Sequence, residues 1–233
     1  MPLPRPIDVG MSWLSSGMRL GGGLRRGPIG PRPETPLIVY EFEACPWCRR
    51  VREALTVLDL VAEIRPCPKN GPRFREAVKV RGGRAMFPYL VDPNTDVEMY
   101  ESADIVRYLF ERYGDGPPPA SLVGPLFPLS SQLASLMRLG MGAFYRGDPK
   151  KAPEQPMVLY GMEASPYTRI VREALCELEL SYLLQPTPTK GQRWGALRER
   201  SGKAMVPYLI DPNTGTEMHE SADIRDYLVA TYG

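Results

Sequence analysis

The sequence predicts an α/β protein made of two tandem βαβαββα domains, each preceded by a short apolar helical segment. The first observation behind this prediction is an internal duplication. Residues 84–113 and 203–232 are identical at 19 of 30 positions, which indicates two copies of one folding unit. The second observation is that, within the first copy, short apolar runs alternate with segments of helical periodicity. The chain has 233 residues, which is enough for two small domains with their own cores.

The elements of the first copy follow in order from its residue pattern. An apolar strand comes first, and the next segment places its apolar residues from Val51 to Leu58 on one helical face. The stretch Asp92-Pro93-Asn94-Thr95 predicts a turn between two strands, and Ser102 is expected to cap the last helix. The predicted strands span residues 37–42, 61–65, 89–92 and 97–100, and the predicted helices span residues 49–60, 73–80 and 102–113.

The duplication also predicts the domain organisation. Residues 18–23 align with residues 137–142, so the N-terminal segment belongs to the repeated unit and is not expected to be a cleaved signal. The apolar segments at residues 11–20 and 122–145 are expected to pack between the two units. We therefore expect an N-terminal apolar segment over residues 1–35, a first domain over 36–114, a linker with an apolar helix over 115–155, and a second domain over 156–233.

Composition excludes several classes of protein. Lys and Arg number 29 against 27 Asp and Glu, a net charge of +2, without the basic excess of a dedicated nucleic-acid binder. No run of 18 apolar residues occurs, so no transmembrane segment is expected. Four cysteines are too few for a disulfide scaffold, and the C-x-x-C they include is typical of a reducing compartment.

The motif Cys45-Pro46-Trp47-Cys48 lies where the first strand ends and the first helix begins. A sulfur at a helix N-terminus is favoured as thiolate, so Cys45 is the expected nucleophile and Cys48, one turn later, the resolving thiol. Trp47, Arg49 and Arg50 are expected to shape access and charge around the sulfur. The alternative is half a zinc site, which needs a second ligand pair.

No such second pair occurs at short spacing, so no metal is expected. Of the remaining candidates, Cys176 is expected to be a core residue and His219 a structural one. Cys67 is placed either near the active site or at its rim.

Two further motifs occur in both copies. Phe87-Pro88 and Val206-Pro207 each precede a strand, where a proline lies at an edge or in a cis bond. Recurrence favours the cis form, which would leave the preceding backbone groups free for an extended peptide. Glu101-Ser102 opens a helix, whose N-terminus can bind a carboxylate while Glu101 holds an ammonium group; alternatively, Ser102 is only a cap.

These motifs together resemble the thioredoxin-like N-terminal domain of glutathione transferases and glutaredoxins. The tandem arrangement, with P-Y-L-x-D-P-N-T and E-S-A-D-I in each copy, is similar to the duplicated glutaredoxin-like proteins of plants, algae and cyanobacteria. The resemblance implies glutathione as co-substrate, reacting at Cys45, and a chloroplast location. The glutathione-binding residues that it implies are Pro46, Trp47, Phe87, Pro88, Glu101 and Ser102.

The second copy departs from this pattern at the dithiol. Ser165 and Thr168 stand where the first copy has its two cysteines, so no internal disulfide can form there. Val206, Pro207, Glu220 and Ser221 are kept, however, and with Ser165 they are candidates for a second glutathione site. The alternative is that these residues only maintain the fold and that the second domain is a docking or structural half.

The leading prediction is a glutathione-dependent thiol–disulfide oxidoreductase whose partners are glutathionylated or disulfide-bearing proteins. Cys45 attacks the mixed disulfide, and a second glutathione or Cys48 regenerates it. One alternative is a protein that binds glutathione or an iron–sulfur cluster without turnover. Another is a transferase or isomerase resembling the glutaredoxin-like prostaglandin E synthase. The all-helical second domain of glutathione transferases is not evident in the sequence, which counts against transfer to bulky electrophiles.

Overall fold

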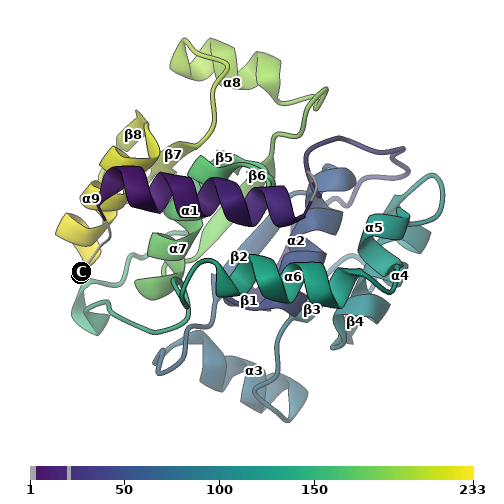
Figure 1. Ribbon diagram of the computed structural model, residues 1–233. Coiled ribbons are helices and arrows are strands. Elements are labelled where there is room, and N and C mark those ends of the chain that lie inside the picture. Colours follow the sequence, from purple (N-terminus) through teal and green to yellow (C-terminus); the bar gives the residue numbers. More distant parts are fainter. Residues whose placement is uncertain (1–3, 20–21) are drawn as a thin grey trace.

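The computed structural model describes residues 4–19 and 22–233, and the strands of this part of the chain form one mixed sheet. Its eight strands lie in the order β4-β3-β1-β2-β6-β5-β7-β8 (Figure 1). The first four belong to the first copy of the repeat and the last four to the second copy. The predicted α/β fold of two thioredoxin-like units is therefore confirmed, and the two units share a continuous sheet.

The strands and helices predicted for the first copy are all present. They are β1 (Leu37–Glu41), α2 (Pro46–Val57), β2 (Ala62–Pro66), α3 (Phe74–Gly82), β3 (Tyr89–Asp92), β4 (Val97–Met99) and α4 (Ser102–Tyr113). Helix α2 begins and ends three residues earlier than predicted. Proline suits the first helical position, so Pro46 starts the helix directly after Cys45. Asp59 adopts a positive φ of 56° just after the helix ends, a conformation that a helix cannot continue through.

The second copy repeats this order after a helical connection. Its elements are β5 (Met157–Gly161), α7 (Pro166–Glu177), β6 (Tyr182–Pro186), α8 (Trp194–Ser201), β7 (Tyr208–Asp211), β8 (Thr216–His219) and α9 (Ser221–Tyr232). The remaining helices are α1 (Arg5–Met18), α5 (Ala120–Val123), α6 (Phe127–Leu136) and the short 3₁₀ helix η1 (Pro149–Lys151).

The two copies join through their second strands. β2 and β6 pair antiparallel, with Glu63 opposite Leu183 at the centre of the ladder. Because these residues are equivalent in the repeat, the pairing relates the copies by an approximate twofold rotation. The boundaries expected between the domains at residues 36, 115 and 156 stay a prediction, since the sheet passes from one copy to the other without a break.

The helices cover the sheet unequally. The main apolar core contains buried residues of α2, α4, α7 and α9 together with residues of the inner strands. A smaller core holds Tyr40, Cys67, Val78, Tyr89 and Val91, and it places α3 against the sheet through Val78. The twofold rotation between the copies brings the cysteine helix α2 and its counterpart α7 to the middle of the molecule (Figure 1).

Helices α1 and α6 form an outer layer over α2 and α7 (Figure 1). Although α1 precedes the first copy, it packs on α7 of the second, while α6 packs on α2 of the first. The N-terminal helix of each copy thus crosses to the other copy, and the predicted packing of the apolar segments between the units is confirmed.

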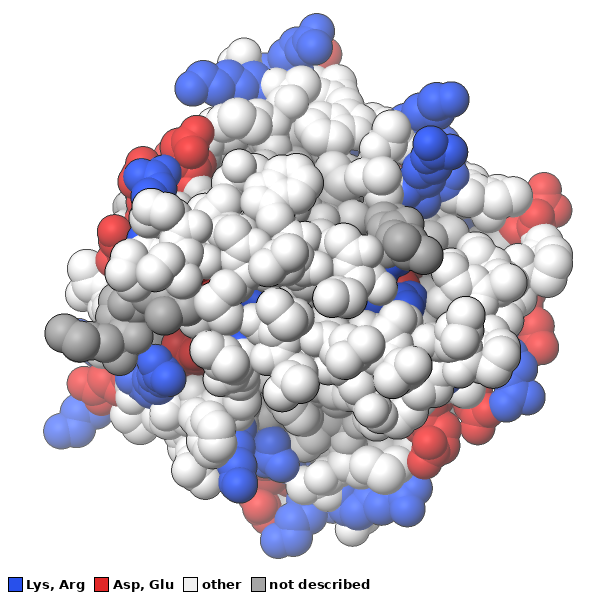
Figure 2. Space-filling model, viewed as in Figure 1, with Lys and Arg blue, Asp and Glu red and all other residues white. Residues whose placement is uncertain are grey.

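The outer face of α1 and α6 leaves Trp13, Leu14, Leu129 and Leu136 exposed. Figure 2 shows that Lys, Arg, Asp and Glu gather mainly around the rim of this face. Within residues 4–19 and 22–233, no helix combines the length and the apolar character needed to cross a membrane.

Candidate functional site

Three motifs predicted from the sequence meet at one end of the first copy's sheet. β1 runs antiparallel to β3 with Tyr40 opposite Tyr89, so the end of β1 that leads to Cys45 lies beside the residues that precede β3. The ring of Tyr89 in turn contacts that of Tyr100, with centroids 4.4 Å apart. The topology therefore brings the cysteine motif, the proline motif and the start of α4 to the same edge.

Cys45 lies at the N-cap of α2, where its sulfur accepts a hydrogen bond. The backbone N–H of Cys48 donates to Cys45 Sγ at 3.3 Å. The Cys48 side chain beside it, followed by the backbone N–H groups of Cys48 and Trp47, lowers the pKa of Cys45 although burial opposes this. This position favours the thiolate of Cys45, as the sequence predicts.

Cys48 has the opposite character. Burial, and then its hydrogen bond to Cys45, raise the pKa of Cys48 well above its ordinary value. Its side chain is 0% exposed, whereas that of Cys45 is 4% exposed and the neighbouring Trp47 is 38% exposed. Cys45 is therefore the more accessible of the two cysteines, and Cys48 is fully enclosed by the protein.

The proline motifs are both in the cis form, as the sequence predicts. The bonds are Phe87–Pro88 and Val206–Pro207. In the first copy the ring of Phe87 packs edge-on against Phe42, with centroids 6.1 Å apart. Because Phe42 O accepts from the Cys45 N–H, the proline motif contacts the turn that positions the nucleophile.

The expectation that Ser102 caps α4 is wrong. The N-cap residue is Glu101, which adopts a φ of 65° and is exposed, and no side chain makes a capping hydrogen bond there. Ser102 is instead the first residue of the helix and is buried. The positive φ of Glu101 turns the chain sharply at the start of α4. The exposed Glu101 carboxylate therefore directly precedes the spare N–H groups of the first helical turn.

In the second copy, the structure brings four of the five predicted site residues to one cavity. The cavity has a volume of about 730 Å³ and is lined by Val206, Pro207, Glu220 and Ser221 together with Arg5, Pro6, Val9, Tyr167 and Met205. Three of these lining residues come from α1, the helix that crosses over from the first copy. Ser165 is not among the lining residues; it is the N-cap of α7, and its Oγ accepts the Thr168 N–H at 3.1 Å.

Helices α1 and α6 also fasten the two N-cap loops. Ser131 on α6 donates its hydroxyl hydrogen to Pro46 O at 2.8 Å. The equivalent Ser12 on α1 donates to Pro166 O at 2.7 Å. Each crossing helix therefore holds the cysteine loop, or its counterpart, of the copy on which it packs.

The expected role of Arg49 at the sulfur is wrong. Arg49 is 1% exposed and its guanidinium pairs with Glu163 of the second copy, Nη1 to Oε1 3.3 Å. Its guanidinium also donates to Ser135 Oγ of α6 at 3.4 Å, so Arg49 lies where the two copies meet. Arg50 does lie near the motif, with its guanidinium 5.7 Å from the Trp47 ring centroid and 4.1 Å from that of Phe127.

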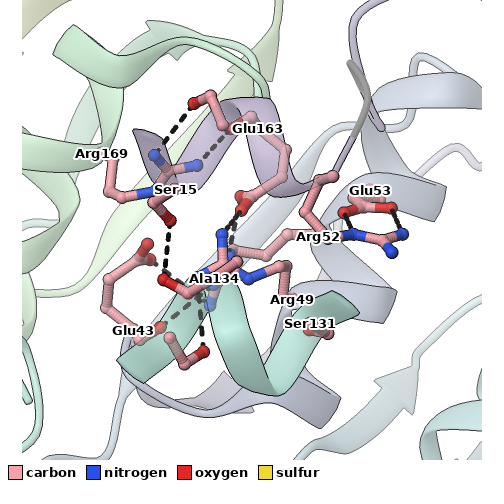
Figure 3. A network of polar contacts seen from close by, with 12 residues as sticks. Ser15, Glu43, Arg49, Arg52, Glu53, Ser131, Ala134, Glu163 and Arg169 are labelled. Atoms are coloured by element: carbon pink, nitrogen blue, oxygen red, sulfur yellow. Dashed lines mark hydrogen bonds and ion pairs between the residues drawn. The ribbon is translucent and has the colours of Figure 1, made fainter. Parts of the chain in front are cut away.

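Arg49 is part of a buried ionic network between the copies, which the sequence analysis missed (Figure 3). Arg52 pairs with Glu163 at 2.9 Å, and Arg172 pairs with Glu43 at 3.0 Å and with Glu163 at 2.8 Å. These side chains are each 1–2% exposed. The signal in the sequence is that an Arg-x-x-Arg occurs near the start of this helix in both copies, at residues 49–52 and 169–172.

Glu41, at the end of β1, is a second residue that the sequence analysis missed. Its side chain is 2% exposed and its carboxylate pairs with Arg52. Burial raises the pKa of Glu41 to about 7, against the lowering effect of Arg52. The available signal was an acid four residues before Cys45, at a position where the second copy has Gly161.

The other cysteines and the histidine lie in structural positions. Cys67 is fully buried in the smaller core, so placing it at the rim is wrong, and Cys176 is buried on α7 as predicted. The ring of His219 stacks on Tyr208, with centroids 4.5 Å apart. Among the described residues, no group of three or more His, Cys, Asp or Glu side chains has a geometry suited to a metal ion.

Comparison with known proteins gives one family match. The sequence profile described as glutathione S-transferase, N-terminal domain, matches residues 39–119 and again residues 159–233, together about two thirds of the chain. Among solved structures, the chain is similar to "Leishmania TDR1 - a unique trimeric glutathione transferase", with 14% identity over 86% of this chain and 68% of that one, at a TM-score of 0.29. A search of curated proteins returned no match.

Proposed function

This chain belongs to the glutathione S-transferase N-terminal domain family, and on that premise we propose that it is a glutathione-dependent thiol–disulfide oxidoreductase acting through Cys45 and Cys48. The family supports a glutathione-related function. In this proposal the first domain removes glutathione from glutathionylated proteins, while the second domain binds glutathione or a partner without redox chemistry. A chloroplast location belongs to the same proposal and is tested by fractionating the source cells.

The observation that carries the proposal is the asymmetry of the two thiols. Cys45 is the N-cap sulfur with the lowered pKa and the small accessible surface, and Cys48 is the enclosed sulfur with the raised pKa. A dithiol exchange enzyme needs one thiol that attacks from the surface and one that attacks only the first.

The reaction balances with glutathione species alone. The Cys45 thiolate attacks the glutathione sulfur of a mixed disulfide; the bond between Cys45 and glutathione forms, and the target protein leaves as a thiolate that takes up a proton. The sulfur of Cys48 then attacks Cys45 Sγ and expels the bound glutathione as thiolate, or a second glutathione attacks the sulfur of the bound glutathione and expels Cys45 as thiolate. The first route gives an internal disulfide and the second gives glutathione disulfide; in both, the mixed disulfide of the target protein is reduced by two electrons to a free thiol.

Six residues are proposed to bind glutathione in the first domain: Pro46, Trp47, Phe87, Pro88, Glu101 and Ser102. The contact of the Phe87 ring with Phe42, with centroids 6.1 Å apart, supports a position of the proline motif next to the turn that precedes Cys45. The start of α4 has spare N–H groups for a carboxylate, and the exposed Glu101 has a negative charge for an ammonium group.

The second domain is proposed to bind glutathione in the cavity beside Val206–Pro207. Its volume of about 730 Å³ falls within the usual range for small-molecule pockets. Glu220 and Ser221 line it, and Arg5 from α1 adds a positive charge, with Arg5 Nη2 3.9 Å from Glu220 Oε2. Ser165 keeps its place at the helix N-cap but has no thiol, so exchange is not proposed there.

The first experiment measures the intact mass of the reduced protein after incubation with glutathione disulfide, followed by digestion to assign the modified cysteine. We expect a glutathione adduct on Cys45 or an internal Cys45–Cys48 disulfide. The variant Cys45→Ser should abolish deglutathionylation, whereas Cys48→Ser should keep a monothiol route and accumulate the adduct. Full activity of Cys45→Ser would refute the mechanism.

A second experiment separates the two domains. Glutathione binding is measured by calorimetry on the full chain with Ser102→Ala and with the matched variant Ser221→Ala. We expect one binding event to weaken in each variant. If Ser221→Ala leaves every binding event unchanged, the second domain is a docking half and its cavity does not bind glutathione.

A further inference from the structure

One buried titratable group lies beside the dithiol and is not used in the exchange reaction described above. Glu41 ends β1 with a side chain that is 2% exposed, and isolated acids are expensive to bury. Its Oε2 pairs with Arg52. Among the positive charges around it, that of Arg52 lowers the pKa of Glu41 most, followed by that of Arg172.

The repeat shows what the Glu41 side chain lies against. In the second copy this position is Gly161, and a Cβ atom built there would lie 2.3 Å from Thr168 Cγ2 and 3.0 Å from Thr168 Oγ1. Thr168 is the counterpart of Cys48. Because the two copies share one fold, the side chain at position 41 leaves the strand directly toward the side chain at position 48.

Helix geometry in the first copy agrees with this placement. Arg52 follows Cys48 by four residues on α2, so both side chains lie on the same face of the helix. Since Arg52 pairs with Glu41, the carboxylate lies along that face. The negative charge of Glu41 also contributes to the raised pKa of Cys48.

The acid and the dithiol occur together and are absent together. The first copy has Glu41 with Cys45 and Cys48, and the second has glycine with serine and threonine at the matching positions. The rest of the ionic network is repeated, since Glu43 and Glu163 are equivalent, as are Arg52 and Arg172. Glu41 is thus an addition to the network in the copy that has the resolving thiol.

We propose that Glu41 is the proton acceptor for Cys48 when Cys48 resolves the mixed disulfide on Cys45. The inference rests on the proposed function, because it concerns the second step of that reaction. The Cys48 S–H gives its proton to the Glu41 carboxylate. The resulting thiolate forms a bond with Cys45 Sγ, the bond between Cys45 and glutathione breaks, and glutathione leaves as thiolate. Glu41 then releases its proton, through the leaving thiolate, to solvent.

The surroundings of Glu41 suit a group that changes charge at neutral pH. Its pKa of about 7 results from burial and from the carboxylates of Glu43 and Glu163, opposed by Arg52 and Arg172. An acceptor of this kind is mostly ionised at pH 8 and mostly protonated at pH 6. The titratable and charged groups around it are Cys45, Cys48 and Arg52 of the cysteine helix, Glu43 and Cys67 of the first copy, and Glu163, Arg172, Cys176 and Tyr182 of the second.

The test follows the two steps separately in the full-length protein. The reduced protein is mixed with glutathione disulfide, quenched with acid at intervals, and analysed by intact mass, which resolves reduced protein, adduct and internal disulfide. For the wild type, we expect the rate from adduct to disulfide to rise with pH and to level off above about pH 7. In Glu41→Gln, adduct formation at Cys45 should stay within about twofold, while resolution at pH 7 should slow by about 100-fold or more, the lower end for general base catalysis.

Control variants separate proton transfer from a structural effect. Glu41→Asp keeps the carboxylate and should recover part of the rate and the levelling of the pH profile. Glu43→Gln removes a carboxylate that pairs with the same Arg52, 3.4 Å away; it should keep the levelling of the pH profile but move its midpoint to lower pH, because Glu43 contributes to the raised pKa of Glu41.

Three results would overturn the proposal. The first is resolution at the wild-type rate and with the wild-type pH profile in Glu41→Gln. The second, which needs no variant to fold, is a wild-type resolution rate that rises tenfold per pH unit through pH 9 without levelling. The third is a wild type that forms neither adduct nor disulfide. This result refutes the proposed function itself, and the absence of the first step, adduct formation, distinguishes it from a failure of the Glu41 proposal alone.

Discussion

Replacing Glu163 by glutamine tests the ionic network that joins the two copies. The Glu163 carboxylate is within 3.3 Å of Arg49, 2.9 Å of Arg52 and 2.8 Å of Arg172, and all four side chains are nearly inaccessible. Removing one partner of a buried ion pair costs about 3–5 kcal/mol, because the opposite charge stays buried. Here three guanidinium groups lose a shared partner, so Glu163→Gln should lose at least about 3 kcal/mol of unfolding free energy.

The lowered pKa of Glu163 agrees with this magnitude. The positive charges of Arg172, Arg52 and Arg49 outweigh burial and lower the pKa of Glu163 to about 2 from an ordinary value of 4.5. A depression of this size corresponds to about 3 kcal/mol. Because the folded pKa is the lower one, this stability is fully present above about pH 4.5 and is lost as the pH falls toward about 2.

Urea unfolding of the wild type and of Glu163→Gln measures the difference. It should be constant between pH 5 and pH 7 and should shrink below pH 4.5. The control is Glu76→Gln, which removes one side of an exposed pair with Lys79 at 3.4 Å and should change stability by less than about 1 kcal/mol. A loss below about 1 kcal/mol in Glu163→Gln, or a difference that grows as the pH falls from 5 to 3, would refute the reasoning.

Three further predictions concern the surroundings of the dithiol. Because the pKa of Glu41 is raised to about 7, its contribution to stability is complete below pH 4.5 and is lost as the pH rises through 7. In urea unfolding, the stability of the wild type should therefore fall relative to that of Glu41→Gln between pH 4.5 and pH 7. Parallel stability curves for the two proteins would contradict this prediction. Ser131→Ala removes a hydrogen bond to the cysteine loop, so it should lower stability by about 1 kcal/mol and change the alkylation rate of Cys45. The matched variant Ser12→Ala should lower stability without changing that rate. Equal alkylation rates in Ser131→Ala and the wild type would argue against positioning of the loop by α6. Gly161→Ala should lower the free energy of unfolding by about 1–3 kcal/mol, because its Cβ would lie 2.3 Å from Thr168 Cγ2. Adding Thr168→Ser, which removes that methyl group, should recover most of the loss in thermal unfolding. Unchanged stability of Gly161→Ala would disprove the close packing.

Most of the fold was predictable from local pattern and repetition. The strand and helix periodicities from residue 37 to residue 113 depend on burial of alternating or one-sided apolar residues, which neighbouring residues determine. The identity of the two copies predicted that the second would fold like the first. The cysteine motif and its position at a helix start were also local, since Pro46 favours a first helical position.

The candidate site was predictable only in part. The residues of the cysteine and proline motifs and of the start of α4 could be named because each is a short motif. Ser102 was predicted as a cap, yet the left-handed backbone of Glu101 made Glu101 the N-cap, and a single sequence does not show such a φ for a residue other than glycine. Arg49 was expected at the sulfur because it neighbours Cys48 in the chain, but adjacent residues of a helix point to different sides, and Arg49 pairs with Glu163.

The sequence by itself determined that this is a duplicated α/β protein with one copy that has the dithiol and one copy that lacks it, because these properties depend on residue type, spacing and repetition. The tertiary structure alone decided that β2 pairs with β6 and that α1 and α6 cross to the opposite copies. It also decided that Arg52 and Arg172 share Glu163 in the interior and that Glu41 lies along the helix face of Cys48. Each of these contacts joins residues distant in the chain, and their energies depend on burial and on a partner's charge, which no local pattern encodes.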